Sequence, residues 1–235
     1  MFLGAILYTT VGHAGASAYI AIMALFSVPT LVIRPTALVL NIFVSIFVSL
    51  RFVRAGFFRL RVLAPILIGA VPMAFIGGYI QLPPSIYRPL VGVVLIVAAI
   101  RLMLSRDIKS ETEIKDPPIF YGVASGAAIG LLSGLTGTGG GIFLSPLILF
   151  LGWSDTKTAS GVAAVFILFN SIAGLLGNLT SVRSLPPDLP LLVAVTLLGA
   201  FVGTYLGIKH LNTPAIQKTL GIVLLIAGVK MLGVY

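Results

Sequence analysis

The stretch GLTGTGGGIFLSPLILFLGW, residues 134–153, decides how this chain folds, because it places three consecutive glycines and a proline in one of the most apolar parts of the sequence. Glycine is among the poorest helix formers, so the cluster predicts that one helix ends there and another begins. The apolar part that follows, residues 141–153, would make a helix only roughly 20 Å long. We therefore predict a short helix that starts at the glycines.

The composition places this break inside a membrane. Of the 235 residues, 58% are apolar and 9% are charged, whereas soluble domains carry about 25% charged residues. Segments that approach the ~20 apolar residues of a helical span follow one another along the chain. Runs such as PLVGVVLIVAAIRLML, residues 89–104, stay apolar on every side, which does not fit the alternating strands of a membrane barrel. The sequence predicts an all-α polytopic membrane protein.

Ten apolar segments fall into two groups of five. They cover residues 1–11, 14–28, 35–50, 62–80 and 87–104 in the first half, and residues 118–135, 141–153, 158–179, 189–208 and 215–232 in the second. The polar segment SRDIKSETEIKDPP separates the halves and carries four of the six acidic residues. We predict a first repeat at 1–104, a cytoplasmic linker at 105–117 and a second repeat at 118–235. Because five is an odd number, the second repeat is inverted if every segment crosses.

The basic residues indicate an orientation. Placing both termini outside puts eleven of the fifteen lysines and arginines in the cytoplasm, as the positive-inside rule expects. The eleven are Arg51, Arg54, Arg59, Arg61, Arg101, Arg106, Lys109, Lys115, Lys157, Lys209 and Lys218, while Arg34, Arg88, Arg183 and Lys230 stay outside. Fusing each short pair of segments into one crossing gives a weaker bias, so short helices that re-enter the membrane stay an alternative.

Each repeat opens with a short pair of segments that small residues interrupt. The break is GHAGA at residues 12–16 in the first repeat and GTGGG at residues 137–141 in the second. Irregular backbone at membrane depth must be shielded by protein or line a watery cavity. A helix that begins there presents unpaired N–H groups and a partial positive charge, which together bind anions. Short helices that meet at the midplane are the arrangement of inverted-repeat transporters.

The residues around both breaks form the predicted substrate site. They are Gly12, His13, Gly15, Ser17 and Asn41 in the first repeat, and Thr136, Thr138, Gly139, Gly140, Gly141, Ser145 and Asn170 in the second. The glycines permit positive φ and close approach of a ligand, and the hydroxyls and His13 can donate hydrogen bonds. All six acids lie in predicted loops or helix starts, which disfavours a cationic substrate. A structural role for His13, and interhelical hydrogen bonding for both asparagines, remain alternatives.

Other residues have simpler predicted roles. Close helix packing is the alternative explanation of the clustered glycines, and it is the expected role of the isolated Gly77, Gly78, Gly199 and Gly203. Arg34 is expected to extend toward the membrane interface, where it could also attract anions. Ser154 or Asp155 is expected to cap the helix that follows.

These motifs resemble the TauE/SafE family of bacterial membrane transporters, the sulfite-exporter and toluene-sulfonate-permease group. The resemblance rests on GLLSGLTGTGGGIFLSPLILFLGW and the following TASGVAAVFILFNS, with the weaker counterparts VGHAGASAYIAIMALFSVP and RPTALVLNIFVS. It covers essentially the whole chain and implies transport of small sulfur-containing anions, such as sulfite or organosulfonates. The first repeat departs from the glycine-rich pattern at His13, Ala14 and Ala16.

The predicted function is secondary transport of small sulfur-containing anions across the bacterial inner membrane, by alternating access around the glycine-rich helix starts. An anion channel, or a transporter of another small organic anion, is the alternative. The sequence contains no nucleotide phosphate loop, no Gly-x-Ser-x-Gly nucleophile and no cluster of metal ligands, so we expect no enzyme, cofactor or metal. The expected partners are a small anionic substrate and the lipid bilayer, with no nucleic acid and with a homo-oligomer left open.

Overall fold

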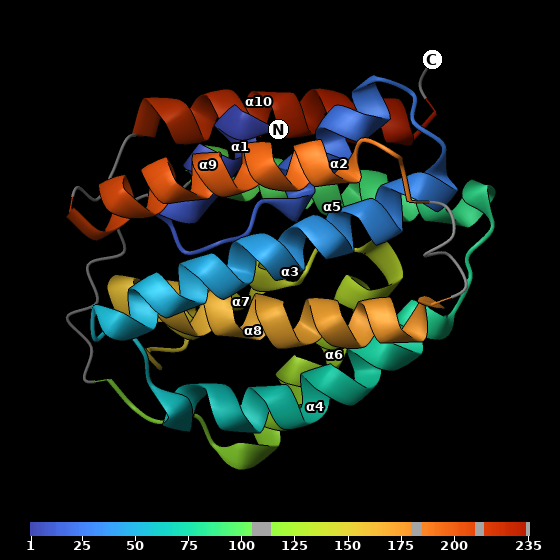
Figure 1. Cartoon of the computed structure of the whole chain (residues 1–235). Coiled ribbons are helices and arrows are strands. Elements are labelled where there is room, and N and C mark those ends of the chain that lie inside the picture. Colours follow the sequence, from blue (N-terminus) through green and yellow to red (C-terminus); the bar gives the residue numbers. More distant parts are fainter. Residues whose placement is uncertain (105–113, 180–184, 210–213, 234–235) are drawn as a thin grey trace.

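The computed structural model describes residues 1–104, 114–179, 185–209 and 214–233. Within them the chain forms ten helices and no strand (Figure 1). The first half contains α1 (Phe2–Thr10), α2 (Ala16–Leu25), α3 (Thr30–Arg54), α4 (Leu60–Tyr79) and α5 (Pro84–Leu104). The second contains α6 (Ile119–Thr136), α7 (Gly141–Phe150), α8 (Thr156–Gly177), α9 (Leu189–Lys209) and α10 (Pro214–Met231). Each expected apolar segment matches one helix, with its ends shifted by a few residues.

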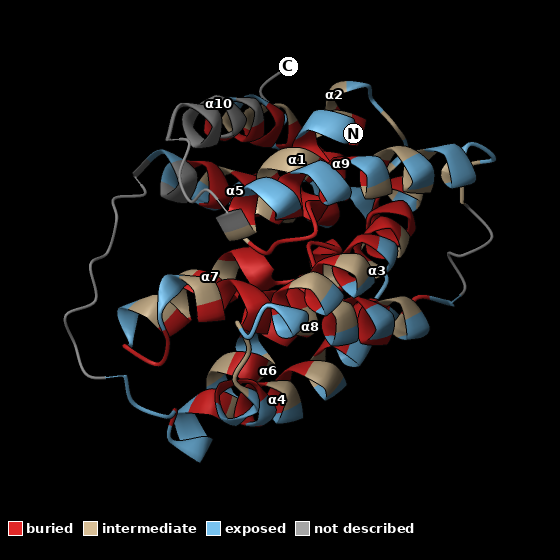
Figure 2. Cartoon of the chain, turned by 60° about the vertical axis from the view of Figure 1, so that its left-hand side comes forward, coloured by how far each residue is buried: buried red, intermediate tan, exposed pale blue. Residues whose placement is uncertain are grey.

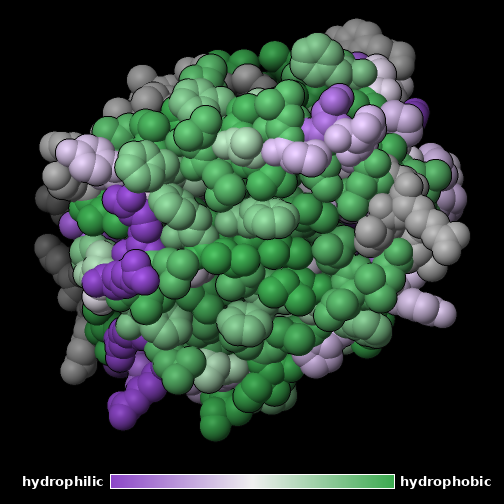
Figure 3. All heavy atoms as spheres, in the orientation of Figure 1, coloured by the Kyte–Doolittle hydropathy of each residue, from purple (hydrophilic) through white to green (hydrophobic). Residues whose placement is uncertain are grey.

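Five helices, α3, α4, α6, α8 and α9, are long and apolar enough to cross a bilayer. Helices α2 and α7 are also apolar but have only 10 residues each. Large apolar side chains cover most of the outer surface, and hydrophilic ones gather toward its edges (Figure 3). The prediction of an all-α polytopic membrane protein is confirmed.

The helices are arranged in layers around α3 and α8 (Figure 1). Helix α8 packs on α3, α4 and α7, and α3 also packs on α2 and α9. Helices α4 and α6 form one outer pair, while α1 with α9 and α5 with α10 form pairs on the opposite side. Buried residues concentrate where α3, α7 and α8 meet (Figure 2). The interior of the protein is therefore built around the two short helices and their long neighbours.

Glycines set how closely the outer helix pairs approach. The facing pairs are Gly126 with Ile66, Gly130 with Ala70 and Gly134 with Ala74 between α6 and α4, and Gly199 with Phe2, Gly203 with Ile6 and Gly207 with Thr10 between α9 and α1. A Cβ on any of these glycines would overlap the backbone carbonyl that it faces. Because the contacts advance in the same direction along both chains, each pair is parallel. Gly77 and Gly78 face backbone in the same way, so the packing role expected for these isolated glycines is confirmed.

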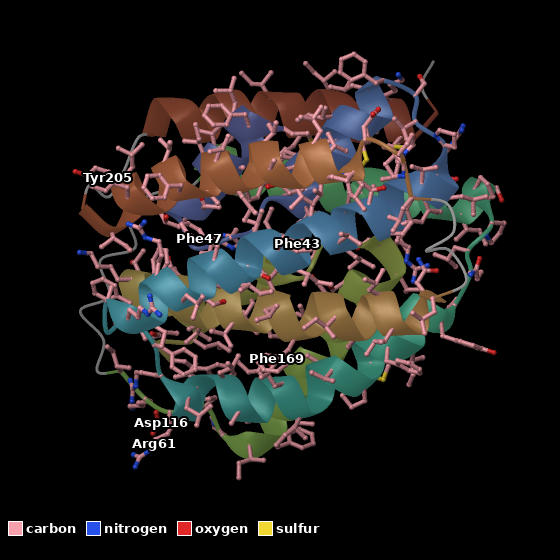
Figure 4. All side chains as sticks on the ribbon, viewed as in Figure 1. Phe43, Phe47, Arg61, Asp116, Phe169 and Tyr205 are labelled. Atoms are coloured by element: carbon pink, nitrogen blue, oxygen red, sulfur yellow. The ribbon has the colours of Figure 1, made fainter. Side chains whose placement is uncertain are left out.

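One end of the helix bundle is rich in basic residues. Arg59 donates to Asp116 at 2.9 Å, and Arg61 lies 3.9 Å from the same carboxylate (Figure 4). The Lys157 ammonium lies 5.1 Å from the centre of the Phe57 ring. Six of the eleven residues predicted as cytoplasmic lie at this end: Arg51, Arg54, Arg59, Arg61, Lys115 and Lys157. The side chains of the other five lie outside the described residues.

Asp155, one of the two residues expected to cap α8, is the residue that caps its N-terminus. The Asp155 carboxylate accepts hydrogen bonds at 3.0 Å from the backbone N–H groups of Lys157 and Thr158. Burial alone would raise the pKa of Asp155, but these hydrogen bonds and the one from the Thr158 side chain outweigh it and lower the pKa below the ordinary value. An ionised carboxylate is therefore the more stable cap.

We expect Gly126→Ala to lower the free energy of unfolding by ~1–3 kcal/mol, because the new methyl group overlaps Ile66 in a packed interface. Gly174→Ala is the matched control, since this glycine is also helical and the nearest atom would lie 3.6 Å from the new Cβ. Thermal unfolding in detergent measures both variants. Equal melting temperatures for the two would contradict the close packing of α4 on α6.

We expect Asp155→Ala to lower the free energy of unfolding by ~1 kcal/mol at neutral pH, the usual value of a helix cap. Because folding lowers the pKa of Asp155, the stabilisation is present at neutral pH and is lost as the pH falls through the folded pKa. Melting temperatures measured across acidic to neutral pH test this. Asp155→Asn keeps a capping oxygen without a charge, so its own pH profile should lack this component. A penalty for Asp155→Ala that is constant with pH would contradict the assignment.

Candidate functional site

The two short helices begin at the same small cavity. Its lining includes Gly15, Ala16 and Ser17 from the start of α2, and Gly141 and Ile142 from the start of α7. From this cavity, hereafter the central cavity, α7 runs to the basic end of the bundle, where Lys115 donates its backbone N–H to Gly152. Helix α2 runs to the opposite end, where Lys230 donates to the Leu25 carbonyl at 2.7 Å. The two helix starts therefore converge from opposite ends of the molecule.

Paired glycines produce both helix starts. Gly15 and Gly140 precede the first residues of α2 and α7, with φ of 100° and 77°. Three residues earlier, Gly12 and Gly137 also have positive φ, at 76° and 83°. Side chains are strained in this region of φ and ψ, and glycine is not. A pair of positive-φ glycines with the same spacing thus occurs once in each half of the chain, and the second half adds Gly139, with φ of 75°.

The electrostatics of the central cavity favour an anion. The first-turn N–H groups of a helix have no acceptor within the helix, and neither cap at α2 or α7 supplies a side-chain acceptor. Each helix start also carries a partial positive charge, equivalent to roughly half an elementary charge. The acids in the described part of the chain, Asp116, Asp155 and Asp188, lie outside the helices. No described carboxylate therefore offsets the two helix starts.

His13 connects the two halves of the chain at this point. Its Nε2 lies 2.8 Å from the Gly141 carbonyl oxygen and 3.1 Å from Ser145 Oγ. Because a carbonyl oxygen only accepts hydrogen bonds, Nε2 carries a hydrogen in this arrangement. The ring also meets Tyr8 edge-on, with 6.2 Å between ring centres. His13 thus holds the loop before α2 against the first turns of α7.

Buried amides and hydroxyls surround the cavity. Asn41 donates to Ser171 Oγ at 3.3 Å, and Asn170 donates to the Gly139 carbonyl at 3.4 Å. The Thr136 and Thr138 hydroxyls lie 3.0 Å apart. Among the described residues, the Oδ1 atoms of Asn41 and Asn170 have no hydrogen-bond partner. Both asparagines therefore join α3 and α8 to the site and keep hydrogen-bonding capacity.

The structure brings about half of the predicted site residues to the cavity itself. His13, Gly15, Ser17, Asn41, Thr138 and Gly141 line it, and Ser145 contacts it through His13. The other five are absent from the lining: Gly12 lies against Ser160, Gly139 between α3 and α8, Gly140 between α6 and α8, Asn170 on the Gly139 carbonyl and Thr136 on Thr138. These five shape the turns and do not face the cavity.

Besides Ala14 and Ala16, which also line the cavity, sequence reasoning missed four residues around it. Tyr8, Ile142 and Ile167 line it, and Ser171 accepts the Asn41 hydrogen bond. Ser171 stands next to Asn170 as a polar residue in an apolar segment, which was a usable signal. The other three have the residue types of ordinary core positions, so only their packing identifies them.

Arg34 does not extend toward water as expected. It lies at the end of the bundle opposite the basic end, but the residue is only 5% exposed. Its guanidinium donates to the carbonyl oxygens of Gly77, Gly78 and Ile80. These carbonyls lie at the end of α4, where they accept no hydrogen bond from within the helix. The hydrogen bonds that they accept from Arg34 explain why its side chain is buried.

The central cavity is nearly filled in this conformation. Its volume is about 10 Å³, close to the minimum for one water molecule. A sulfite ion, with three oxygens around sulfur, is larger than one water. In this conformation the cavity therefore has no room for an ion larger than one water molecule.

We expect Gly140→Ala to destabilise the protein more than Gly152→Ala. Both glycines have positive φ, at 77° and 67°, so each variant takes on the ~1–2 kcal/mol strain of a left-handed residue. Only at Gly140 does the new Cβ also crowd neighbours, at 2.9 Å from Ile129 and Phe166, whereas Gly152 faces open space. Chemical or thermal unfolding measures the difference, which should be ~1–3 kcal/mol. Equal destabilisation would show that the turn at Gly140 is not tightly enclosed.

The fold and the site together define an α-helical polytopic membrane protein with a buried polar cavity between the starts of two short helices. The family model described as "Sulfite exporter TauE/SafE" matches residues 1–231, and the chain belongs to this family. The chain is also 38% identical over 234 residues to the "Probable membrane transporter protein y4hK" of Sinorhizobium fredii (strain NBRC 101917 / NGR234), covering 98% of this chain and 95% of the relative. No solved structure matches this chain. The protein is a membrane transporter of the TauE/SafE family and not an enzyme.

Proposed function

We propose that this transporter carries small sulfur-containing anions, sulfite or organosulfonates, as a secondary transporter. The observation that supports this most directly is the pair of glycine-capped helix starts that share one cavity with no described carboxylate nearby. The backbone N–H groups and the Ser17 hydroxyl offer donors suited to an oxyanion, and the Thr138 hydroxyl and the His13 ring belong to the same polar lining. The family match names sulfite export, which agrees with a small oxyanion as substrate.

Alternating access is the mechanism we propose, with the two halves as inverted repeats. The helix pairs agree with this: α1 on α9 and α6 on α4 are both parallel, and each pair combines the first helix of one half with the fourth helix of the other. Helices α3 and α8, third in each half, pack on one another, as do the fifth helices α5 and α10. Movement of one half against the other would open the central cavity first to one side and then to the other.

The direction of the chain in the membrane follows from the basic end. We propose that this end, with Arg51, Arg54, Arg59, Arg61, Lys115 and Lys157, faces the cytoplasm of a bacterial cell and that both termini face outside. The opposite end, where α2 ends and α4 ends, then faces the exterior. The predicted linker at 105–117 lies mostly outside the described residues, and its described part, residues 114–117, adjoins the basic end.

The proposal predicts saturable counterflow. Proteoliposomes loaded with unlabelled sulfite or sulfoacetate should transiently accumulate the same labelled anion from outside, because a carrier exchanges one substrate for another. Gly140→Ala should slow the initial rate by about tenfold or more, equivalent to at least ~1.4 kcal/mol. Gly152→Ala, which keeps the positive-φ strain without crowding the site, is the matched control and should keep the rate.

Three other outcomes would change the assignment. Rapid equilibration that does not saturate, and that internal substrate does not stimulate, would indicate an anion channel. Counterflow with carboxylates but not with sulfur oxyanions would replace the substrate class and keep the carrier mechanism. Gly140→Ala with an unchanged rate, in a folded protein, would remove the glycine turn from the site.

A further inference from the structure

A second polar pocket lies at the end of the protein opposite the basic end. It has a volume of about 30 Å³ and is lined by Thr30, Leu31, Arg34, Pro35, Gln81, Leu82, Tyr87 and Asn178. This pocket, hereafter the Arg34 pocket, lies between the start of α3, the α4–α5 connection and the end of α8. Its volume exceeds that of the central cavity. It contains Arg34, the one buried arginine or lysine among the described residues.

The positive charge of Arg34 is incompletely balanced. Its terminal nitrogens donate to the carbonyls of Gly77, Gly78 and Ile80, which form the negative end of α4. A helix end supplies the equivalent of only roughly half an elementary charge. Both ion pairs among the described residues involve Asp116, at the basic end, and neither involves Arg34. A guanidinium buried without a carboxylate is costly unless another anion approaches it.

Arg34 also keeps an unused donor. Its Nε lies buried without a hydrogen-bond partner among the described residues, although the side chain is 95% buried and lines the pocket. Asn178, which is 1% exposed, likewise has an amide oxygen without a partner there. Asn178 therefore adds a polar amide to the pocket lining. Thr30 adds a hydroxyl to the lining.

A few residues in direct contact separate the Arg34 pocket from the central cavity. Tyr87, which lines the pocket, donates its hydroxyl to the Thr136 carbonyl at 3.1 Å. The Thr136 hydroxyl lies 3.0 Å from that of Thr138, which lines the central cavity. Between them, the turn at Gly137 packs directly on the backbone and side chain of Arg34. The glycine turn between α6 and α7 therefore stands between the two spaces.

We propose that the Arg34 pocket is a second anion-binding site, a vestibule in which a small oxyanion is held by the Arg34 guanidinium before or after it occupies the central cavity. The identity of the anion as a sulfur oxyanion rests on the proposed function; the vestibule itself rests on the buried charge and the pocket. Tyr87 and the Thr136–Thr138 turn form the barrier that the anion passes.

The natural absence of cysteine makes a direct test available. Thr30→Cys places a single thiol in the pocket lining, and its labelling by a maleimide reports whether the pocket is occupied. Methanesulfonate should slow labelling by roughly tenfold at about ten times its dissociation constant. Dimethyl sulfone, a neutral molecule of similar shape, should not slow it. Ser85→Cys, exposed at the same end and outside the pocket lining, should be labelled equally fast with either compound.

Charge variants then identify the residue responsible. In the Thr30→Cys background, Arg34→Gln should abolish protection by methanesulfonate, and Arg34→Lys should keep part of it. Arg88→Gln removes an exposed charge from the same end and should leave protection unchanged. Because Arg34 also supports the end of α4, the comparison of methanesulfonate with dimethyl sulfone in the Thr30→Cys protein is decisive even if Arg34→Gln does not fold.

The outcomes separate the vestibule from the proposed function. Protection by methanesulfonate alone, retained in Gly140→Ala, supports a vestibule independent of the central cavity. No protection in folded Thr30→Cys, equal protection by the neutral sulfone, or loss of protection in folded Gly140→Ala would each overturn it. If protection is found but no sulfur oxyanion gives counterflow, the vestibule stands and the proposed substrate fails.

Discussion

The whole arrangement depends on one constraint, which is that backbone N–H groups at membrane depth must find partners without bulk water. Long helices meet this constraint internally, and α2 and α7 do not, because each begins in the interior with a glycine that offers no capping side chain. The protein encloses both helix starts within α1, α3 and α8, and joins them through His13. What remains is a small polar space at two helix starts, which is the physical basis for proposing that it binds an anion.

Glycine has two separate uses in this chain, and they are distinguished by backbone conformation. Along α6 and α9, helical glycines let backbones approach until a Cβ would overlap the partner, which fixes the outer pairs. At the helix starts, Gly12, Gly15, Gly137 and Gly140 have positive φ and reverse the chain. The closely packed outer pairs combine helices from both halves. Any motion that opens the centre must therefore move the two helices of each pair together, or slide one helix along the other at the glycine contacts.

The fold could be predicted from the sequence because hydropathy and the glycine clusters act locally: all ten segments became helices, and the short one after Gly140 begins where the glycines end. The candidate site was predicted less completely. Nothing in the pattern distinguishes Tyr8 or Ile167 from core residues, since only tertiary packing brings them to the cavity. Arg34 was expected to extend toward water, because a charged side chain in a membrane usually does so. Instead it is buried and donates hydrogen bonds to the unpaired carbonyls at the end of α4.

The distribution of positive charge also bears on how an anion would move. A full charge at the central cavity would bind an oxyanion strongly and release it slowly, whereas transport requires both binding and departure. In this protein the guanidinium lies to one side, in the Arg34 pocket, and the central cavity offers helix starts, hydroxyls and one imidazole. Partial charges from two opposed helices attract an anion from either side without favouring one exit. On the proposed mechanism, the charge that attracts the anion and the neutral donors that hold it midway are separated by the turn at Gly137, so binding strength can fall as the anion moves inward.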